Sequence, residues 1–512
     1  MKGLLDALLK LGPQLAEHVL LSAAAVALGI AVALPLAVWA GRSPSVARIS
    51  LGFASLVQTI PALALLALFF PILLAARTVF GEGLPTLGFL PAWLALALYA
   101  LLPILRNAVT ALTNVDAEAL EAADGLGMTG WQRLRLIEAP LAAPYVMAGI
   151  RTASVWTIGA ATLATTIGQR SLGDPIFAGL QTQNWVLVLA GCIASAGLAL
   201  IADALLGLIE RGFALRRPRQ ALLGAFLALL GIAAAALSLA DWREDSGEAV
   251  VIGAKSFSEQ YILARAIGTL LEEEGYAVEY RDSLGSAVAH NAVASGEIDI
   301  LVDYTGTIWT NQLGRTDSPD REAMYDELVR WEAETSGTRI LGRLGFENAY
   351  GLAMRQEQAR ALQIASIADL TNSAAQLTIG GDPEFFERPE WMAVRGAYSL
   401  RFGERRTFSP TLMYSALGSG AVDVISAYTS DGRIAADNLT VLADPRGAFP
   451  NYDAILLVSP TFAEDERLAA ALQPLIESVD VEAMREANYL VDREEEKRTP
   501  QQAADWLLER IR

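Results

Sequence analysis

Six long apolar stretches lie in the first 240 residues, and they constrain the fold more than any other feature of the chain. A helix needs about 20 mostly apolar residues to cross the hydrocarbon core of a bilayer. Residues 1–240 carry 14 Lys and Arg and 11 Asp and Glu, whereas residues 241–512 carry 25 and 46. We therefore predict an all-α polytopic membrane domain of about six spans, at 17–40, 47–75, 87–107, 143–168, 185–208 and 220–240.

Basic residues in short loops orient such spans, because they favour the cytoplasmic side. The loops after spans one, three and five hold most of them: Arg42, Arg48, Arg106, Arg133, Arg135, Arg211, Arg216, Arg217 and Arg219. The remaining loops hold only Arg77 and Arg170. This pattern predicts a multi-pass protein of the bacterial cytoplasmic membrane whose acidic second half lies outside. The second span contains Pro61, where we expect a kink or a break.

The second half has the pattern of an α/β domain. AVVIGAKSF resembles a buried strand and SEQYILARAIGTLLEEEGY an amphipathic helix, and further strands are expected at AVEYRDS, EIDILVDY, QLTIGG, AVDVISAY and DAILLVSP. Strands that alternate with helices predict a mostly parallel sheet with crossover helices. About 260 residues are enough for two lobes.

These patterns suggest domain boundaries. We predict a transmembrane domain over 1–219, a last span and linker over 220–248, and a binding domain over 249–512, with one lobe at 249–350 and 451–512 and the other at 351–450.

Composition excludes several classes of function. A net charge of −18 argues against a nucleic-acid partner, since phosphate binding needs a basic face. His18 and His290 are the only histidines, so no metal site is expected. None of the four lysines follows a glycine, so the phosphate loop G-x-x-x-x-G-K-[ST] is absent from the sequence. We therefore expect no cofactor on this chain, and any ATP must be held by another subunit.

The loop between the third and fourth spans reads EALEAADGLGMTGWQRLRLIEAPLAAP. Small alanines allow a helix to approach a partner closely, and a glycine permits a sharp turn. The loop resembles the EAA loop of ABC importer permeases, with Ala139 where that family usually has Leu. The matching positions are Glu121, Ala122, Ala123, Gly127, Ile137 and Pro140. The resemblance implies a coupling helix that docks on a separate ATPase subunit, and a homodimer of this chain. The alternative is an amphipathic helix that rests on membrane lipid.

Six blocks of the second half combine aromatic, basic and acidic residues: IGAKSFSEQYILA, SGEIDILVDYTGT, LGFENAYGLA, EFFERPEW, SAYTSDGRI and FPNYDA. They resemble the glycine betaine, carnitine and choline binding proteins of osmoprotectant uptake systems. Together with the membrane half, the chain is similar to the members that fuse permease and binding protein. This resemblance implies a two-lobed domain like the periplasmic binding proteins, which closes on its ligand.

A quaternary ammonium group has no hydrogen to donate, so proteins hold it against aromatic faces. A carboxylate on the same ligand favours a guanidinium or ammonium group. The resemblance implies a cage of Tyr304, Tyr350, Tyr428 and Tyr452, and a carboxylate site of Lys255, Thr307 and Arg388. Each residue alone is more commonly a core tyrosine or a surface charge. The family pattern is changed at Ser258, Asp303, Thr429, Ser430 and Asn451.

The expected function is therefore that of an ABC importer permease with a fused substrate-binding domain, which takes up small quaternary ammonium solutes such as glycine betaine. Lys255 and Arg388 favour a ligand with a carboxylate over choline. They do not distinguish glycine betaine from carnitine, proline betaine or ergothioneine. A membrane-tethered ligand sensor is the main alternative of another class. An enzyme is not expected, because two distant histidines give no Ser-His-Asp set.

Overall fold

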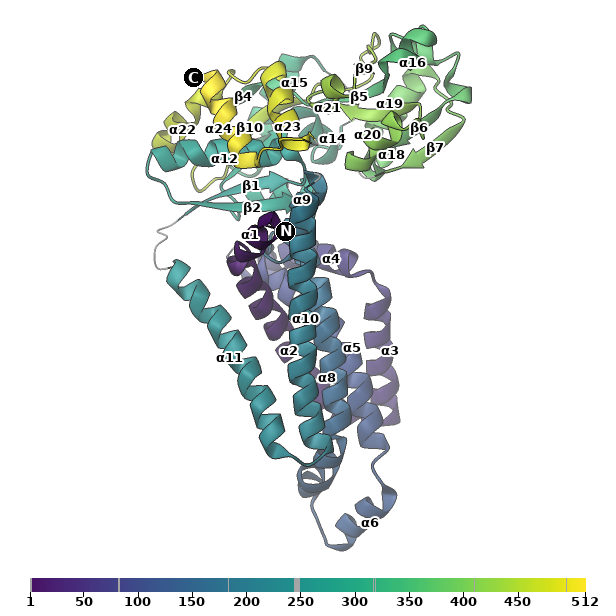
Figure 1. Ribbon diagram of the computed structural model, residues 1–512, viewed down its shortest axis with the longest axis vertical. Helices are drawn as coiled ribbons and strands as arrows, with labels where there is room; N and C mark the ends of the chain where they lie inside the picture. Colours follow the sequence, from purple (N-terminus) through teal and green to yellow (C-terminus); the bar gives the residue numbers. More distant parts are fainter. Residues whose placement is uncertain are drawn as a thin grey trace. The chain divides into compact units, whose positions relative to one another are not determined.

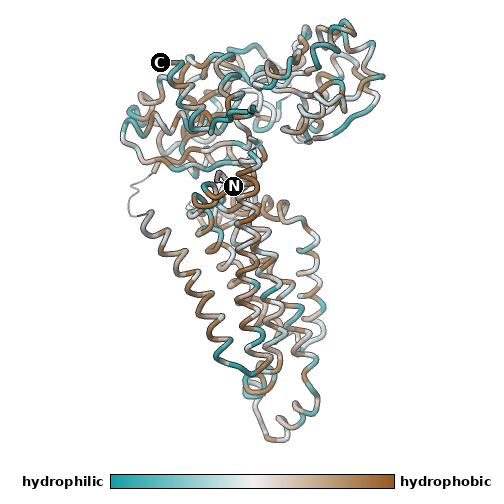
Figure 2. Tube along the Cα trace, in the orientation of Figure 1, coloured by the Kyte–Doolittle hydropathy of each residue, from teal (hydrophilic) through white to brown (hydrophobic). Residues whose placement is uncertain are grey.

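The apolar half of the chain folds into a bundle of helices, and apolar residues run along the long ones (Figures 1 and 2). The computed structural model describes residues 2–81, 83–182, 184–243, 249–315, 317, 319–408, 410–493 and 495–512. It separates into two units. The first is Met1–Ile176 with Val186–Ser246, and the second is Phe177–Trp185 with Gly247–Arg512.

The helices of the first half include both long and short segments. They are α1 (Lys2–Leu9), α2 (Gly12–Ala40), α3 (Pro44–Thr59), α4 (Ala62–Phe80), α5 (Phe89–Thr113), α6 (Ala117–Gly125), α7 (Gly130–Arg133), α8 (Ala139–Ala161), α9 (Gly173–Gln181), α10 (Trp185–Ala214) and α11 (Pro218–Arg243). Five segments among the described residues are long and apolar enough to cross a membrane: α2, α4, α5, α10 and Pro218–Leu239 of α11. The prediction of an all-α polytopic domain is confirmed.

Two of the expected spans are not single continuous α-helices. The second is divided at Pro61, as predicted: α3 ends at Thr59, Ile60 is extended with ψ 126°, and α4 starts at Ala62. Proline removes a backbone donor and disfavours helix in the preceding residue, which explains the break. The fourth corresponds to α8 and a following 3₁₀ helix, Thr162–Ile167. Its apolar character is reduced by Arg151, so it is not among the five.

Small residues allow α2, α5 and α8 to pack closely. A Cβ added at Gly29 of α2 would lie 3.2 Å from the Cβ of Ala100 in α5. A Cβ added at Gly149 of α8 would lie 2.8 Å from the carbonyl oxygen of Pro103, so a larger residue cannot fit there unchanged. Close contact between small residues holds membrane helices together, because lipid removes most of the hydrophobic driving force between them.

Arg151 of α8 forms ion pairs with two acids of α10. Its Nε and Nη2 donate to the two oxygens of Asp203 at 2.5 and 2.6 Å, and its Nη1 donates to Glu210 at 3.2 Å. The two acids are seven residues apart and therefore share one face of α10. Charges within membrane helices are stabilised by such pairing. This ionic cluster connects the fourth and fifth expected spans.

The second half contains two five-stranded sheets. The first has the order β2-β1-β3-β10-β4, with β1 (Val250–Lys255), β2 (Val278–Leu284), β3 (Ile300–Tyr304), β4 (Arg339–Glu347) and β10 (Asp453–Val458). The second has the order β7-β6-β8-β5-β9, with β5 (Tyr350–Arg355), β6 (Thr378–Gly381), β7 (Glu404–Thr407), β8 (Val424–Tyr428) and β9 (Leu439–Val441). Each sheet belongs to one lobe (Figure 1). The expected two-lobed α/β class is confirmed.

Helices connect and cover these strands. They are α12 (Ser258–Glu273), α13 (Ser286–Ala294), α14 (Thr305–Asn311), α15 (Arg321–Thr335), α16 (Gln356–Ala361), α17 (Ile367–Leu370), α18 (Pro383–Glu387), α19 (Pro389–Tyr398), α20 (Pro410–Gly418), α21 (Arg433–Ala436), α22 (Glu466–Leu472), α23 (Val481–Asp492) and α24 (Pro500–Ile511). The strands predicted at AVVIGAKSF, AVEYRDS, EIDILVDY, QLTIGG, AVDVISAY and DAILLVSP are β1, β2, β3, β6, β8 and β10.

Both sheets are mixed: in each, four of the five strands run in one direction, in line with the expected mostly parallel arrangement, and one strand runs opposite to them. β1 and β6 pair in parallel with their neighbours, but β10 and β5 pair antiparallel with theirs. The chain leaves the first sheet after β4 and returns before β10. β3 and β8 end at the side of their sheet where the chain crosses between the lobes. β10 and β5 start at that same side, so each runs antiparallel to its neighbour, β3 or β8. The ends of β1, β3 and β8 and the starts of β5 and β10 therefore gather at the crossovers.

Candidate functional site

Lys255, Asp303 and Tyr304 come together because β1 and β3 are parallel neighbours. The register aligns Gly253 with Leu301, which places Lys255 level with Asp303. Lys255 Nζ donates to Asp303 Oδ1 at 2.5 Å, and it lies 5.3 Å from the centroid of the Tyr304 ring. Both charged side chains are buried, at 3% and 1% exposure. The aspartate that departs from the family pattern is thus the ion-pair partner of the predicted ligand-binding lysine.

Tyr452 is placed beside the end of β3 by the segment that follows that strand. Thr305 Oγ1 donates to the carbonyl of Asn451 at 3.2 Å and accepts from the N–H of Asp453 at 3.0 Å. A Cβ added at Gly306 would lie 2.8 Å from Cε1 of Tyr452. The DYTGT motif therefore needs its glycine to admit the ring. Asn451 contributes its backbone carbonyl to this contact, so its departure from the family residue leaves the contact intact.

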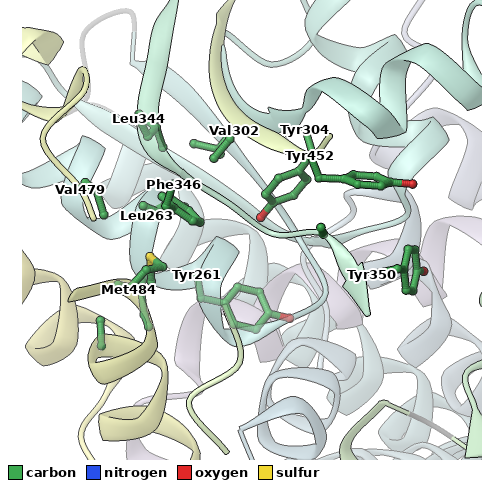
Figure 3. Packing of buried hydrophobic residues seen from close by; sticks show 14 of the residues in the cluster. Tyr261, Leu263, Val302, Tyr304, Leu344, Phe346, Tyr350, Tyr452, Val479 and Met484 are labelled. Atoms are coloured by element: carbon green, nitrogen blue, oxygen red, sulfur yellow. The ribbon is translucent and has the colours of Figure 1, made fainter. Parts of the chain in front are cut away.

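The second sheet supplies two further rings. Tyr350 and Tyr428 are directly opposed across the β5–β8 pair, with ring centroids 5.0 Å apart and hydroxyl oxygens 3.3 Å apart. The ring of Tyr350 also meets Tyr452 edge-on at 6.1 Å and Phe385 at 5.1 Å. Figure 3 shows Tyr304, Tyr350 and Tyr452 with neighbouring residues of the buried cluster. Rings from both lobes thus meet at the crossovers.

Arg388 lies among these rings and is paired with an acid two residues away. Its Nε and Nη2 donate to Glu390 Oε1 at 3.1 and 2.8 Å. Its Nη2 also lies 3.3 Å from the hydroxyl of Tyr452 and 3.4 Å from that of Thr310, and its guanidinium carbon is 5.3 Å from the centroid of the Tyr350 ring. Thr310 and Tyr452 belong to the lobe of the first sheet, so these contacts join the two lobes.

Burial sets the protonation of this site. Burial raises the pKa of the Tyr304 and Tyr452 phenols well above its ordinary value, so both remain hydrogen-bond donors. Burial opposes ionisation of Glu390 as well. The hydrogen bond and charge of Arg388 outweigh it, with help from the Tyr452 phenol, and hold the pKa of Glu390 below its ordinary value. Glu390 is therefore an anion at neutral pH.

The structure gathers the four predicted tyrosines, Lys255 and Arg388 at the facing edges of the two sheets. Thr307 lies half-buried on the first turn of α14. The threonine hydroxyl that contacts Arg388 and Glu390 is that of Thr310, one turn later. The ligand-binding roles of these residues stay predictions.

Sequence reasoning overlooked a set of neighbours that complete the site: Glu259, Thr310, Asp382, Phe385 and Glu390. Glu259 lies in the same KSFSEQ motif as Lys255, and Phe385 and Glu390 lie in the same FFERPEW motif as Arg388. An acid close in sequence to a predicted ligand-binding residue was therefore the available signal. It was ambiguous, because most acids in such positions are solvated.

The predicted coupling loop is a short helix, a turn and a second short helix. Asp116 caps α6 by accepting from the N–H of Glu118 at 3.0 Å. The chain turns at Gly127, whose φ of 69° favours glycine. Thr129 and Gln132 then form a capping box that starts α7. A π-helical turn, Leu134–Glu138, leads into α8. In the first unit, α6 lies at one end of the bundle and α4 at the other (Figure 1).

This loop exposes large apolar side chains: Leu126 is 77% and Trp131 68% exposed. Arg133 stiffens the turn by donating to Asp124 at 3.0 Å and Glu138 at 2.8 Å. The predicted docking residues are distributed over it, with Glu121, Ala122, Gly127 and Pro140 exposed, Ile137 half-buried and Ala123 buried. Their docking role stays a prediction.

Two family models match different parts of the chain. Residues 248–509 match the model of the substrate-binding domain of ABC-type glycine betaine transport systems. Residues 27–215 match that of the inner membrane component of binding-protein-dependent transport systems.

Individual relatives match either the whole chain or one half. An ergothioneine transport permease/ergothioneine binding protein of Helicobacter pylori is 31% identical over 470 residues, which cover 89% of this chain and 82% of the relative. A permease of the glycine betaine/carnitine/choline system of Bacillus subtilis is 44% identical over 38% of this chain and 84% of its own. A glycine-betaine-binding protein of Pseudomonas aeruginosa is 34% identical over 55% and 92%.

A crystal structure of a glycine betaine/carnitine/choline ABC transporter protein is 26% identical, with a TM-score of 0.46, over 51% of this chain and 97% of that one. The matches to the two family models and to the near full-length relative show the family of this chain. The chain belongs to the family of ABC importers in which a multi-pass inner-membrane permease and a glycine-betaine-type substrate-binding domain form one polypeptide.

Proposed function

We propose that this chain binds a small zwitterion with a trimethylammonium group and a carboxylate, and passes it through the membrane with energy from a separate ATPase subunit. The observation that carries the proposal is the convergence of Tyr350, Tyr428 and Tyr452 around Arg388 where the two lobes meet. Each aromatic contact with a desolvated onium group contributes up to about 2 kcal/mol.

The charges of the site support a zwitterion over choline. Arg388 and Lys255 offer a guanidinium and an ammonium for a carboxylate, and each is held by an acid that a ligand carboxylate would replace or join. Relatives with such ligands in their names include the ergothioneine, carnitine and glycine betaine systems already described. Glycine betaine is our first candidate and ergothioneine the second, because the near full-length relative carries the latter name.

The ATPase is proposed to dock on the loop around α6, and two copies of the chain to form the pathway. Support comes from the exposed Leu126 and Trp131, which give a small helical surface with apolar side chains for a partner. Glu121 and Ala122 lie exposed on α6, the helix that ends just before Leu126. Nucleotide binding in the partner would then move this loop and open the pathway in alternation.

Two measurements on the full chain in lipid nanodiscs and proteoliposomes test the proposal. Calorimetry should give heat of binding for glycine betaine, carnitine or ergothioneine, and a weaker signal for choline. Uptake of the bound compound should require a co-reconstituted ATPase subunit and ATP. Binding without ATP-dependent uptake would support the sensor alternative. No binding of any onium compound by folded protein would overturn the ligand class.

A further inference from the structure

Three of the four cage tyrosines donate their phenol hydrogen to a buried carboxylate. The Tyr304 hydroxyl donates to Glu259 Oε1 at 2.5 Å, and that of Tyr428 lies 3.4 Å from Asp382 Oδ2. The Tyr452 hydroxyl donates to Glu390 Oε1. Glu259 belongs to α12, whereas Asp382 and Glu390 lie eight residues apart on either side of α18, so the three acids come from two separate parts of the chain.

The three carboxylates are fixed before any ligand arrives. Glu259, Asp382 and Glu390 are 2%, 3% and 2% exposed. Glu259 also accepts from Asn348 at 3.1 Å and from Asn488 at 3.2 Å. These extra donors hold its carboxylate in one orientation, so the direction of the Tyr304 hydroxyl is set as well.

The other two acids are held in the same way. Asp382 accepts from the N–H of Phe385 at 2.9 Å and thereby caps α18. Glu390 accepts from Arg388 at 2.8 Å. A buried acid with several fixed donors does not follow the movement of a ligand, so it can pre-orient the ring that donates to it.

A phenol that donates to a carboxylate carries more electron density in its ring than one that donates to water. The attraction between a cation and an aromatic face depends on the negative charge of that face. Hydrogen bonds inside a protein also polarise one another. A carboxylate behind the hydroxyl therefore strengthens the hold of the ring on a trimethylammonium group, and it does little for a neutral group of the same shape.

The site needs such a contribution because it already contains two cations. Lys255 Nζ lies 5.3 Å from the Tyr304 centroid, and the Arg388 guanidinium carbon lies 5.3 Å from the Tyr350 centroid. Both cations repel a ligand cation over these distances. Asp303 and Glu390 pair with them, while Glu259 and Asp382 place carboxyl oxygens behind the rings. Burial raises the pKa of Glu259, and the hydrogen bonds that its carboxyl accepts from Ser430, Tyr304 and two asparagines oppose this shift.

We propose that Glu259, Asp382 and Glu390 determine specificity at this site: by accepting from the phenols of Tyr304, Tyr428 and Tyr452, they make the cage select a cation over a neutral group of equal size. The inference rests on the proposed function and names residues that act through the tyrosines. Glu259 is the clearest of the three, since its hydrogen bonds within the described residues are to neutral groups: the Tyr304 phenol, the Asn348 and Asn488 amides and the Ser430 hydroxyl.

The test compares each cationic ligand with its carbon isostere. Glycine betaine is paired with 3,3-dimethylbutyrate, and choline with 3,3-dimethylbutan-1-ol. Binding is measured by calorimetry on the full chain in nanodiscs. For Glu259→Gln, the affinity for both cations should fall about three- to thirtyfold, the range of one cation–π contact, while that for the isosteres changes less than about twofold. A purely structural role would weaken both members of each pair alike and would overturn the proposal.

Tyr304→Phe supplies the second measurement, since it removes the hydroxyl and keeps the ring. It should lower glycine betaine affinity by a similar factor, and adding Glu259→Gln to it should have little further effect. Independent, multiplying effects would contradict the claim that Glu259 acts through the phenol. If thermal unfolding shows that Glu259→Gln does not fold, Tyr304→Phe provides the test instead. The ratio of its affinity for each cation to its affinity for the carbon isostere should be lower than in wild type. An unchanged ratio overturns the proposal.

Asp382→Asn and Glu390→Gln should also lower the affinity for each cation relative to its carbon isostere. The choline pair is the cleaner readout for Glu390→Gln, because a ligand carboxylate would gain from the freed Arg388. Absence of any onium binding by the wild-type chain refutes the proposed function instead. Wild-type binding of cation and isostere with equal affinity refutes only the inference.

Discussion

The membrane helices and the binding lobes both pair charged side chains, but the pairs are half-buried in the helices and fully buried in the lobes. In the permease half, Arg151 joins Asp203 and Glu210 between two long helices. In the binding half, Lys255 and Arg388 pair with acids at the ends of strands, where two sheets and two crossovers meet. The first cluster connects regular elements along their length. The second lies where chain segments end, so its members can rearrange around a ligand.

Ion pairs therefore have different consequences in the two halves. Between helices in lipid, an unpaired charge cannot be hydrated, so its pairing with an opposite charge contributes to stability. At the junction of two lobes, a buried pair contributes little net stability and holds polar groups in position for a third charge. Variants of the ion pairs in each half distinguish these two consequences.

The largest effect is expected from Glu121→Lys in α6. Charge reversal on an exposed helix should abolish ATP-driven uptake in proteoliposomes, because the docking surface for the ATPase would be altered. Ligand binding by the same preparation should equal wild type. Glu118→Lys, on the same helix and outside the predicted docking set, is the matched control. Full uptake by the Glu121 variant would remove this residue from the docking surface.

Replacement of Arg151 with Leu should destabilise the permease half. It leaves two acids facing lipid or helix without their cation, at a cost of about 2–3 kcal/mol. Thermal unfolding in nanodiscs should show a lower midpoint and a reduced yield of folded chain, while ligand affinity stays unchanged. Combining it with Asp203→Leu and Glu210→Leu should restore stability. A triple variant as unstable as the single one would contradict the ionic explanation.

Replacement of Arg388 with Met should lower ligand affinity and leave the thermal stability of the permease half unchanged. Glycine betaine affinity should fall about tenfold or more, because a charged hydrogen bond to the ligand contributes about 1.5–3 kcal/mol. Choline should lose less, since it has no carboxylate. Arg433→Met, which also breaks a buried ion pair with an acid, serves as the control for stability alone. Equal losses for both ligands would make Arg388 structural.

The smallest effect is a pH dependence at Asp492. Burial raises the pKa of this carboxyl to about 6, although the charge of Arg433 and the hydroxyl of Ser258 oppose the shift. Between about pH 4 and 6 the folded chain therefore holds a proton that the unfolded chain has released. The free energy of unfolding contributed by this group falls as the pH rises through that interval, and the loss is complete above it.

Asp492→Asn cannot ionise, and its amide oxygen can still accept from Ser258. Its Tm should exceed that of wild type by about 2–4 °C at neutral pH, which corresponds to roughly 1 kcal/mol in a domain of this size. The difference should shrink as the pH falls towards 4. A difference that is constant over this range would show that the carboxyl titrates normally.

The sequence alone determined the features that depend on local composition. Runs of apolar residues define membrane helices whatever their neighbours, because the bilayer imposes one length scale. The break at Pro61, the turn at Gly127 and the main strands follow from the same local chemistry. The aromatic and basic residues of the site were accessible from the sequence because each lies in a recognisable short motif.

The way these motifs come together depends on the tertiary structure. The mixed sheets arise because the chain crosses between lobes twice, and this reverses β5 and β10 relative to a simple alternation of strands and helices. That reversal places Tyr350 opposite Tyr428 and brings Tyr452 beside β3. The partners of the cage could not be predicted: Glu259 is 45 residues from Tyr304, and Glu390 is 62 residues from Tyr452. A hydrogen bond between distant residues depends on the register of whole strands, which local sequence patterns do not contain.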